Sequence, residues 1–129
     1  TELELTDVVT FEGRTNKMSD ELVKNDVFLM TSDFEGMPNA LLEAMASGLI
    51  CISTNCKTGP SDMIDNQTNG FLIPVGDTKF LSDVIVRACN MTAEQSQKMG
   101  FAAREKILAL CDKKNSLDNL TSVIEQANC

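Results

Sequence analysis

The stretch from residue 32 to residue 48, SDFEGMPNALLEAMASG, contains two carboxylates whose positions suit a ligand rich in hydroxyl groups. Glu35 precedes a predicted helix, and Glu43 lies about one and a half turns inside it. A carboxylate accepts hydrogen bonds and paired hydroxyls donate them, so each Glu is suited to a sugar diol. The same pair also fits a structural role, because acidic side chains stabilise the positive end of a helix.

The residues between the two glutamates suit a phosphate. Gly36 allows the backbone to approach a ligand closely, and Pro38 has no amide hydrogen at the first helical turn. The next three amides are predicted to lack an intrahelical partner and to point outward at the positive end of the helix dipole, an arrangement that binds a diphosphate. They belong to Asn39, Ala40 and Leu41. Sugar hydroxyls at Glu35, phosphates on these amides and a second diol at Glu43 outline a nucleotide-sugar.

The elements that must position this stretch follow a β-α-β pattern. Short apolar runs alternate with helical patterns, which is typical of a parallel sheet flanked by helices. The run at 49–54 is apolar on both faces, which predicts a central strand. Ser19 is the predicted N-cap of the first helix, and Gly48 follows the end of the second. Strands are predicted at 8–11, 27–30, 49–54 and 71–75, and helices at 19–25, at 38–47 and through 63–64.

Helical patterns dominate after Asp77. Thr92 and Gln95 form a capping-box pattern at the start of one helix. The apolar positions of the three predicted helices are Phe80, Leu81, Val84, Ile85 and Ala88, then Met99, Ala102, Ala103 and Ile107, and finally Leu117, Leu120 and Ile124. Spacing of this kind buries one face of each helix. The chain is therefore predicted to be one α/β unit with a helical C-terminal tail.

Composition excludes several function classes. The 129 residues are 43% hydrophobic and 23% charged, which suits a single folded domain. The net charge of −8 opposes binding to nucleic acid and to anionic membranes. The chain contains no histidine, so it can form neither a Ser-His or Cys-His catalytic pair nor a His-based metal site.

The cysteines indicate a reducing compartment. The five cysteines lack the C-x-x-C spacing of zinc sites. Cys51 and Cys89 fall in apolar patterns and are predicted to be buried thiols. Reduced thiols predict a cytoplasmic protein, and neither a signal peptide nor an apolar run of membrane length is visible.

The full string E-G-M-P-N-A-L-L-E-A-M-A-S-G, from Glu35 to Gly48, resembles the donor-binding motif of family 4 retaining glycosyltransferases, in which E-G-x-P and E-A-M-A-x-G occur in this register. Four other segments are similar to the same family: VVTFEGR upstream, GPSDMI and NGFLIPVGD downstream, and MGFAAREKIL near the end. The resemblance thus extends over nearly the whole chain.

The resemblance implies the GT-B fold, in which two Rossmann-like domains face one another across a cleft. It implies that the C-terminal domain binds a nucleotide-sugar donor, that the N-terminal domain binds a glycan or glycolipid acceptor, and that no metal or other cofactor takes part. The reaction would transfer a hexose-type sugar to a hydroxyl with retention of anomeric configuration, in glycan or cell-surface polysaccharide synthesis. In the full-length enzyme this would take place in the cytoplasm, at the inner face of the membrane.

The same resemblance assigns roles to residues of the motif. Glu35 would orient the donor sugar and stabilise charge that develops at its ring, without acting as a nucleophile. The Gly36 and Met37 backbone would lie beside that sugar, and Glu43 would bind the ribose. Arg14 would lie near the nucleotide base, although a solvated loop arginine fits this position equally well. The diphosphate would face the amides of Asn39, Ala40 and Leu41.

Residues 1–129 match only part of the family pattern, so we expect a partial nucleotide-sugar-binding domain without the acceptor-binding N-terminal domain. The Arg and Lys that neutralise the diphosphate in the family lie upstream of the matched segments. The isolated chain is therefore expected to be inactive. It is also expected to self-associate through a sheet edge that the missing units would cover.

Two other interpretations remain open at this stage. The first is a non-enzymatic α/β module that keeps the glycosyltransferase fold for contact with another protein. The second is a different binder of a phosphorylated ligand, such as part of a sugar-nucleotide epimerase, but no G-x-G-x-x-G motif follows any predicted strand.

Overall fold

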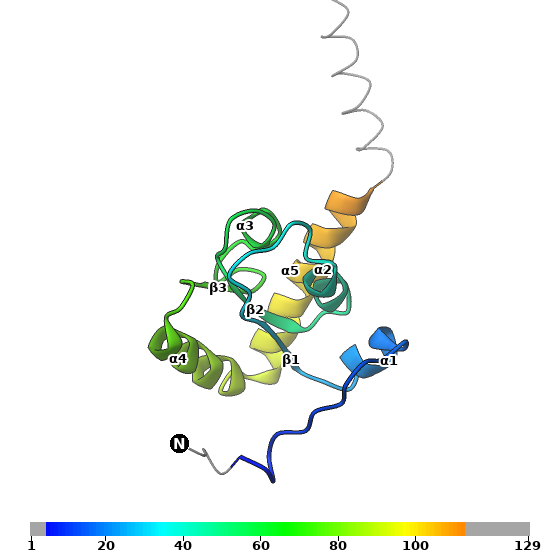
Figure 1. Ribbon diagram of the computed structural model, residues 1–129. Coiled ribbons are helices and arrows are strands. Elements are labelled where there is room, and N and C mark those ends of the chain that lie inside the picture. The colour runs from blue at the N-terminus through cyan, green and yellow to red at the C-terminus, as the bar shows by residue number, and fades with distance from the viewer. Residues whose placement is uncertain (1–4, 113–129) are drawn as a thin grey trace, which may run out of the picture.

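Three short parallel strands form the centre of the fold in the computed structural model, which describes residues 5–112 (Figure 1). They are β1 (Val27–Met30), β2 (Ile50–Thr54) and β3 (Phe71–Ile73), in the order β1-β2-β3. Because all three are parallel, their carboxyl ends lie at one edge of the sheet. The predicted α/β fold, a parallel sheet flanked by helices, is confirmed.

The central strand β2 is buried along its whole length, as predicted. Both of its edges are paired, and helices cover both of its faces. Successive side chains of a strand point to opposite faces, so β2 contributes to two separate cores. Cys51 packs with Leu41 and Met45 on one face, whereas Ile50 and Ile52 pack with residues of β3 and of the following helix on the other.

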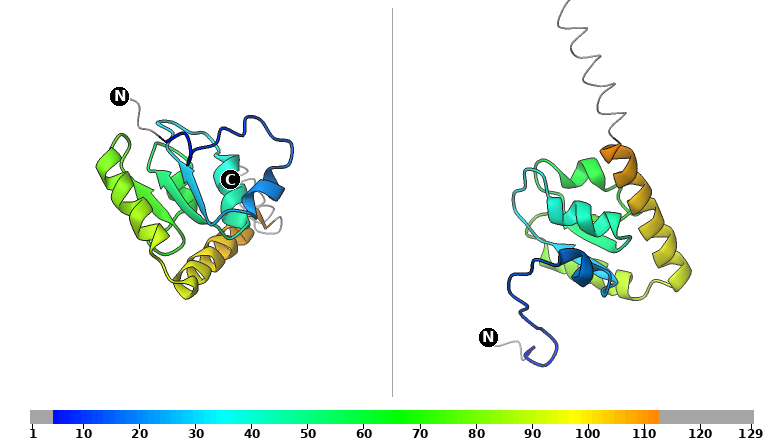
Figure 2. Two further views of the ribbon diagram at one scale, coloured as in Figure 1. Left: turned by 90° about the horizontal axis from the view of Figure 1, so that it is seen from below. Right: turned by 90° about the vertical axis from the view of Figure 1, so that its right-hand side faces the viewer.

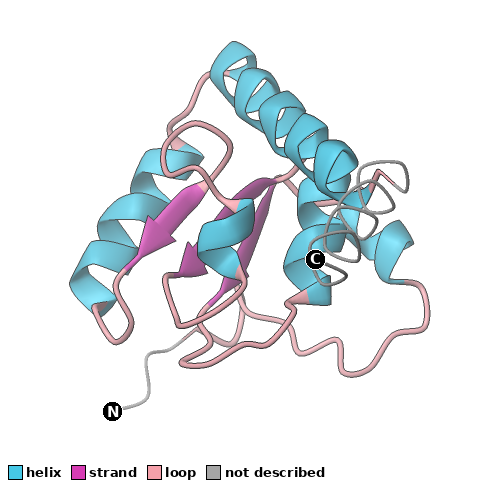
Figure 3. Cartoon of the chain, turned by 90° about the horizontal axis from the view of Figure 1, so that it is seen from above, coloured by secondary structure: helices cyan, strands magenta, loops and turns pink. Residues whose placement is uncertain are grey.

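Helices lie on both sides of the sheet (Figures 2 and 3). α4 (Thr78–Cys89) covers one face and α2 (Asn39–Ala46) covers the other. α5 (Ala93–Cys111) closes both cores, because Met99 packs on the α4 side and Ala103 and Ile107 pack on the α2 side. The short helices α1 (Met18–Leu22) and α3 (Pro60–Met63) each add one residue to the α2 side, Leu22 and Met63.

Local signals determine where the main helices begin and end. Gly48 follows α2 with a φ of +79°, a conformation that favours glycine. The predicted capping box of α5 is confirmed: Thr92 Oγ1 accepts from the Gln95 amide at 3.2 Å, and Gln95 Oε1 accepts from the Thr92 amide at 2.9 Å. β3 ends earlier than predicted, directly before Pro74, which has no amide hydrogen to continue the ladder.

The predicted strand at 8–11 is wrong. These residues form no regular structure beyond a local turn, in which the Val8 and Val9 amides donate to the Leu5 carbonyl. Val8 is 76% exposed and Phe11 is 95% exposed. An apolar run favours a strand but supplies no hydrogen-bond partner, and within the described residues the outer edge of β1 is not paired with this segment.

The first predicted helix is shorter than expected and begins differently. α1 starts at Met18, and its N-cap residue is Lys17, which makes no side-chain capping hydrogen bond. Ser19 therefore lies inside the helix and is not its N-cap. Leu22 is the buried residue of α1, so little packing stabilises a longer helix at this point.

Two residues assigned to the buried face of α4 are exposed. Phe80 is 44% exposed, and Cys89 is also exposed. A helix of twelve residues is about 18 Å long, whereas a strand of three residues is about 10 Å long. The ends of α4 therefore extend past β3, and Val84 and Ala88 are its buried positions.

The last predicted helix, with Leu117, Leu120 and Ile124, and the fifth cysteine, Cys129, lie outside the described residues. In the described range, no helix has both the length and the apolar character needed to cross a bilayer.

The backbones of α5 and of the turn after α2 are in direct contact at Gly100. A Cβ atom at this position would lie 2.1 Å from the Gly48 carbonyl oxygen and 3.0 Å from its carbonyl carbon. Both of these are main-chain atoms, which cannot rotate away as a side chain can. A glycine at position 100 is therefore a condition for packing α5 against α2.

We predict that Gly100→Ala destabilises the chain. Alanine favours a helix interior by about 1 kcal/mol over glycine, but overpacking against rigid atoms costs about 1–3 kcal/mol or more. At 2.1 Å from a main-chain oxygen the clash should prevail, and we expect the free energy of unfolding to fall by about 2 kcal/mol. Urea denaturation measures this change. Gly36→Ala is the matched control, because a Cβ there meets nothing within 4 Å, and a midpoint for Gly100→Ala at or above the wild-type value would contradict the prediction.

Candidate functional site

The loop that follows β1 carries Glu35, as predicted, and lies at the carboxyl edge of the sheet. The loop leads directly into α2, whose first residue is Asn39. Ligands of open α/β sheets bind at this edge, where the loops that follow successive strands meet. Glu35 is thus placed on the side of the molecule where the fold class favours a site.

Two hydroxyl groups position the Glu35 carboxylate from inside the fold. Thr54, the last residue of β2, is 3% exposed, and its hydroxyl donates to the Ser32 carbonyl oxygen. The Ser32 hydroxyl in turn donates to Glu35 Oε1 at 2.6 Å. The carboxylate is therefore tied to the buried central strand through Ser32. One hydrogen bond leaves its second oxygen and a further lone pair available to a ligand.

The turn between β2 and α3 also holds the Glu35 loop in place. The Thr58 hydroxyl lies 2.6 Å from the Glu35 carbonyl oxygen and 2.7 Å from that of Lys57. Gly59 follows with a φ of +98°, and a Cβ atom there would lie 2.7 Å from Pro38 Cδ and 3.1 Å from the Gly36 carbonyl oxygen. The turn thus packs directly against the loop on both sides of Gly36.

The start of α2 offers fewer free amides than the sequence predicted. The Asn39 amide donates to the Met37 carbonyl at 2.9 Å, so it is not without a partner. Leu41 is 0% exposed, so its amide does not point outward into solvent. Ala40 is exposed, and no protein acceptor for its amide is present in residues 5–112. The tight turn before the helix and the burial of Leu41 explain the difference.

The other predicted site residues lie on the surface. Glu43 is exposed on α2, away from the buried face formed by Leu41, Ala44 and Met45. Gly36 and Met37 are exposed in the loop. Arg14 is exposed in the N-terminal segment and makes no hydrogen bond or ion pair within the described range.

A single cleft that joins Glu35 and Glu43 stays a prediction. Neither side chain lines any of three pockets in the described part of the chain. One pocket, of about 180 Å³, lies at the carboxyl edge and includes Thr31 and Asp33 of the loop together with Thr54.

The buried thiols of the sheet do not provide a nucleophile. Burial raises the pKa of the Cys51 thiol from 9.0 to about 12, so it stays protonated at neutral pH. Cys56, directly after β2, is also buried. Among residues 5–112, no cluster of three or more Cys, Asp or Glu residues is arranged to hold a metal ion.

With this geometry established, comparison with known proteins identifies the family. The profile of the family described as Glycosyl transferases group 1 matches residues 1–91. The chain belongs to the group 1 glycosyl transferases. Its α/β fold is shared with solved GT-B glycosyltransferases.

Curated relatives of this group 1 glycosyl transferase chain are considerably longer than it is. The lipopolysaccharide 1,6-galactosyltransferase of Escherichia coli K12 is 47% identical over 62 residues, which are 44% of this chain and 17% of the relative. The N-acetyl-alpha-D-glucosaminyl L-malate synthase of Bacillus anthracis is 33% identical over 105 residues, 81% of this chain and 27% of the relative. The chain thus spans about a quarter or less of these two proteins.

A solved structure of an S. aureus TarM variant superimposes on the group 1 chain with a TM-score of 0.84 at 27% identity, over 92% of this chain and 24% of TarM. That structure contains Fondaparinux, alpha-GlcNAc-glycerol and UDP. The described fold is therefore shared with one part of the longer TarM chain.

Sequence reasoning missed the residues that hold the site together, namely Ser32, Thr54, Thr58 and Gly59. Thr54 and Thr58 are joined to the loop by contacts between segments far apart in sequence, such as Thr58 with Glu35. A threonine at the carboxyl end of the most apolar strand was the available signal, because a hydroxyl there needs a hydrogen-bond partner.

We predict that Gly59→Ala disturbs the Glu35 loop. A left-handed φ costs a non-glycine residue about 1–2 kcal/mol, and the new methyl group would also press on Pro38 and the Gly36 carbonyl. We expect the amide resonances of residues 35–37 to shift in ¹⁵N-labelled protein. The matched control is Gly76→Ala, which has a φ of +78° and no atom within 4 Å of its Cβ. Equal shifts of these resonances in both variants would show that the turn does not brace the loop.

Proposed function

We propose that this chain is the donor-binding part of a retaining glycosyltransferase that moves a sugar from a nucleotide-sugar to a hydroxyl acceptor. The observation that carries the proposal is the positioned carboxylate of Glu35. It stands at the carboxyl edge of the sheet and is held by the Ser32 hydroxyl at 2.6 Å and by the braced loop around it. A preorganised acceptor suits sugar hydroxyls, because it needs no reordering when they bind.

In this proposal Glu35 binds hydroxyls of the donor sugar and stabilises positive charge at its ring in the transition state. It is not the nucleophile. The exposed Gly36 and Met37 backbone lies beside the sugar, and the exposed Glu43 binds the ribose. Arg14 lies near the base in the bound state. These roles follow the resemblance of the E-G-x-P and E-A-M-A-x-G strings to family 4 enzymes.

The described residues offer fewer binding groups to the diphosphate of the donor than to its sugar and ribose. Ala40 is an exposed residue, and its amide has no protein partner in the described residues, whereas the Asn39 amide is paired and Leu41 is buried. The end of a helix contributes about half a unit of positive charge, and the whole chain has a net charge of −8. We therefore propose that cations outside this chain neutralise the diphosphate in the full-length enzyme.

The full-length enzyme is proposed to carry a second, acceptor-binding domain and to work without a metal cofactor in the cytoplasm, at the inner face of the membrane. Its acceptor is proposed to be a glycan or glycolipid in cell-surface polysaccharide synthesis. The relationship to the lipopolysaccharide galactosyltransferase of Escherichia coli K12 supports this class of acceptor. Analysis of the anomeric configuration of the product by ¹H NMR tests the retaining mechanism, and an inverted product would contradict it.

We predict that Glu35→Ala and Glu43→Ala each lower kcat/KM in the full-length enzyme. Loss of a hydrogen bond to a charged group costs about 1.5–3 kcal/mol, equivalent to roughly ten- to a hundredfold in rate. The melting temperature of Glu43→Ala should stay unchanged, because Glu43 is exposed. Glu35→Ala should still fold, because the Glu35 side chain lies off the core.

Glu105→Ala is the matched control for these variants. Glu105 is an exposed glutamate of α5 that makes no described ion pair, so its removal changes the charge equally without touching the proposed site. We expect wild-type kinetics. A glutamate variant with wild-type kinetics and a lowered melting temperature would assign that glutamate a structural role.

We predict that the 129-residue chain alone binds nucleoside diphosphates with a dissociation constant in the millimolar range or weaker, about −4 kcal/mol or less favourable. One free amide and two carboxylates provide little attraction for a diphosphate. Isothermal titration calorimetry with uridine and guanosine diphosphates measures the affinity. Light scattering on the same sample tests whether the chain self-associates through the outer edge of β1, and micromolar binding by a monomer would contradict the proposal for the diphosphate.

A further inference from the structure

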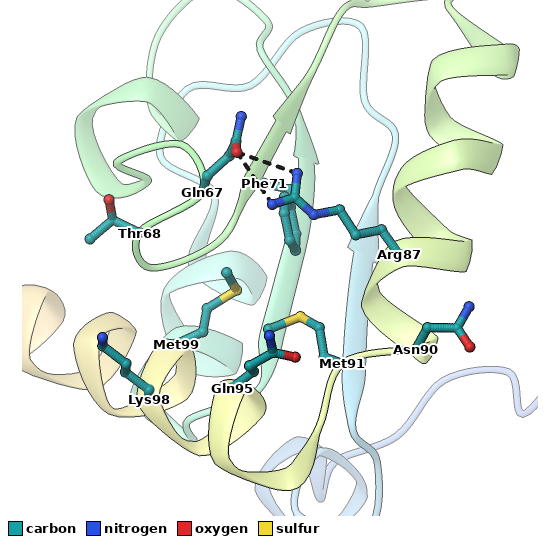
Figure 4. A pocket seen from close by; sticks show the side chains of 9 residues that line it. All are labelled: Gln67, Thr68, Phe71, Arg87, Asn90, Met91, Gln95, Lys98 and Met99. Carbon is teal, nitrogen blue, oxygen red and sulfur yellow. Dashed lines mark hydrogen bonds between the residues drawn. The ribbon is translucent and has the colours of Figure 1, made fainter.

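Figure 4 shows a second pocket from close by. It lies at the opposite edge of the sheet from the Glu35 loop. Its volume is about 570 Å³, within the range of small-molecule sites. The pocket is bounded by the first residue of β3, the end of α4 and the start of α5. Because Phe71 begins β3, whereas Glu35 follows the end of β1, the pocket is separate from the site proposed for the donor.

The charge of this pocket differs from that of the rest of the molecule. Arg87 and Lys98 line it, and no carboxylate is among its described lining residues. Of the two other pockets, one contains Asp26 and the other contains Asp33 and Asp77, and neither is lined by a described cation. In a chain with a net charge of −8, a pocket with two cations and no acid attracts anions locally.

Contacts with Gln67 and Phe71 hold the Arg87 guanidinium in place. Its Nη1 and Nη2 atoms each donate to Gln67 Oε1 at 3.3 Å, and its guanidinium lies 5.2 Å from the centre of the Phe71 ring. These contacts leave three of its five N–H donors free. Arg87 forms no ion pair with a carboxylate in residues 5–112. A fixed guanidinium with free donors suits the paired oxygens of a phosphate.

Lys98 and an apolar floor complete the pocket. Figure 4 shows Arg87 and Lys98 on opposite sides, with Met91 and Met99 between them. Lys98 is exposed and makes no ion pair or side-chain hydrogen bond within the described range. Met91 is half-buried and offers most of the apolar floor, beside the small exposed parts of Phe71 (2%) and Met99 (7%). Methionine adapts its shape to varied apolar ligands. The pocket therefore offers an anion site beside an apolar surface.

We propose that this pocket binds a small phosphate monoester whose organic part is apolar or aromatic. The phosphate is bound by Arg87 and Lys98, and the organic part rests on Met91 and the small exposed parts of Phe71 and Met99. A free inorganic phosphate uses only the cations, and a neutral aromatic compound uses only the floor. The proposal does not depend on the function proposed for the Glu35 loop.

The test is an NMR titration of the ¹⁵N-labelled 129-residue chain with phenyl phosphate, inorganic phosphate and phenylacetate as separate probes. We expect phenyl phosphate to shift the amide resonances of Gln67, Thr68 and Lys98 in a saturable manner. Inorganic phosphate should bind about tenfold or more weakly, because it lacks contact with the floor. Shifts confined to residues 35–43, or inorganic phosphate binding as tightly as phenyl phosphate, would overturn the proposal. Tighter binding of phenylacetate than of phenyl phosphate would show that the pocket prefers a carboxylate to a phosphate. That result would also overturn the proposal.

Two variants with a matched control complete the test. Lys98→Gln should weaken phenyl phosphate binding about tenfold, as expected for a lost hydrogen bond to a charged group. Its melting temperature should stay at the wild-type value, because Lys98 makes no described polar contact with the protein. Arg87→Lys keeps the positive charge but removes the planar guanidinium, whose paired N–H groups can bind two phosphate oxygens at once. This variant should also weaken phenyl phosphate binding.

Lys79→Gln is the control, since Lys79 is an exposed lysine of α4 that does not line the pocket. It should bind phenyl phosphate with wild-type affinity. If Arg87→Lys fails to fold, Lys98→Gln decides alone. Equal affinity of wild type and Lys98→Gln, or an equal loss in Lys79→Gln, would overturn the proposal.

Discussion

The burial of β2 is the constraint on which the rest of the structure depends. Each residue of this strand is buried, and its alternate side chains begin two separate cores. The strand ends at Thr54, whose hydroxyl lies in an almost fully buried position and must find a partner. That partner is the Ser32 carbonyl, the first link to the Glu35 carboxylate. The burial of the apolar strand β2 thus determines where the hydrogen bonds that hold Glu35 are anchored.

The relative strength of the interactions at the carboxyl edge indicates which part of a ligand these residues can recognise. A hydrogen bond to a carboxylate is worth about 1.5–3 kcal/mol, whereas the end of an exposed helix contributes about 0.3–1 kcal/mol to an anion. Glu35 and Glu43 therefore favour hydroxyl groups more strongly than the Ala40 amide favours a phosphate. Carboxylates also repel phosphates, so the role proposed for this segment is to recognise the sugar and ribose of the donor and not its diphosphate.

Local patterns predicted most of the fold, and contacts between distant segments account for the failures. The three strands of the sheet and α2, α4 and α5 follow from apolar runs and end signals such as Gly48 and Thr92. The segment 8–11 has the same local signature but no neighbouring strand in residues 5–112, and sequence reasoning cannot supply one. The loop with Glu35 was located correctly. Its braces at Thr54 and Thr58 were missed, because each joins residues more than twenty positions apart.

The two edges of the sheet differ in chemistry, and rigid packing connects them. Acids and hydroxyls gather at the carboxyl edge near Glu35, whereas Arg87 and Lys98 stand at the other edge. α5 lines the second pocket with Met99, contributes Ala103 and Ile107 to the core under α2, and contacts the turn after α2 through Gly100. A contact between two backbones leaves no space for a side chain, so α5 packs directly against the turn after α2. The acidic character of the chain is therefore not uniform, and the pocket lined by Arg87 and Lys98 lies at the opposite edge of the sheet from Glu35.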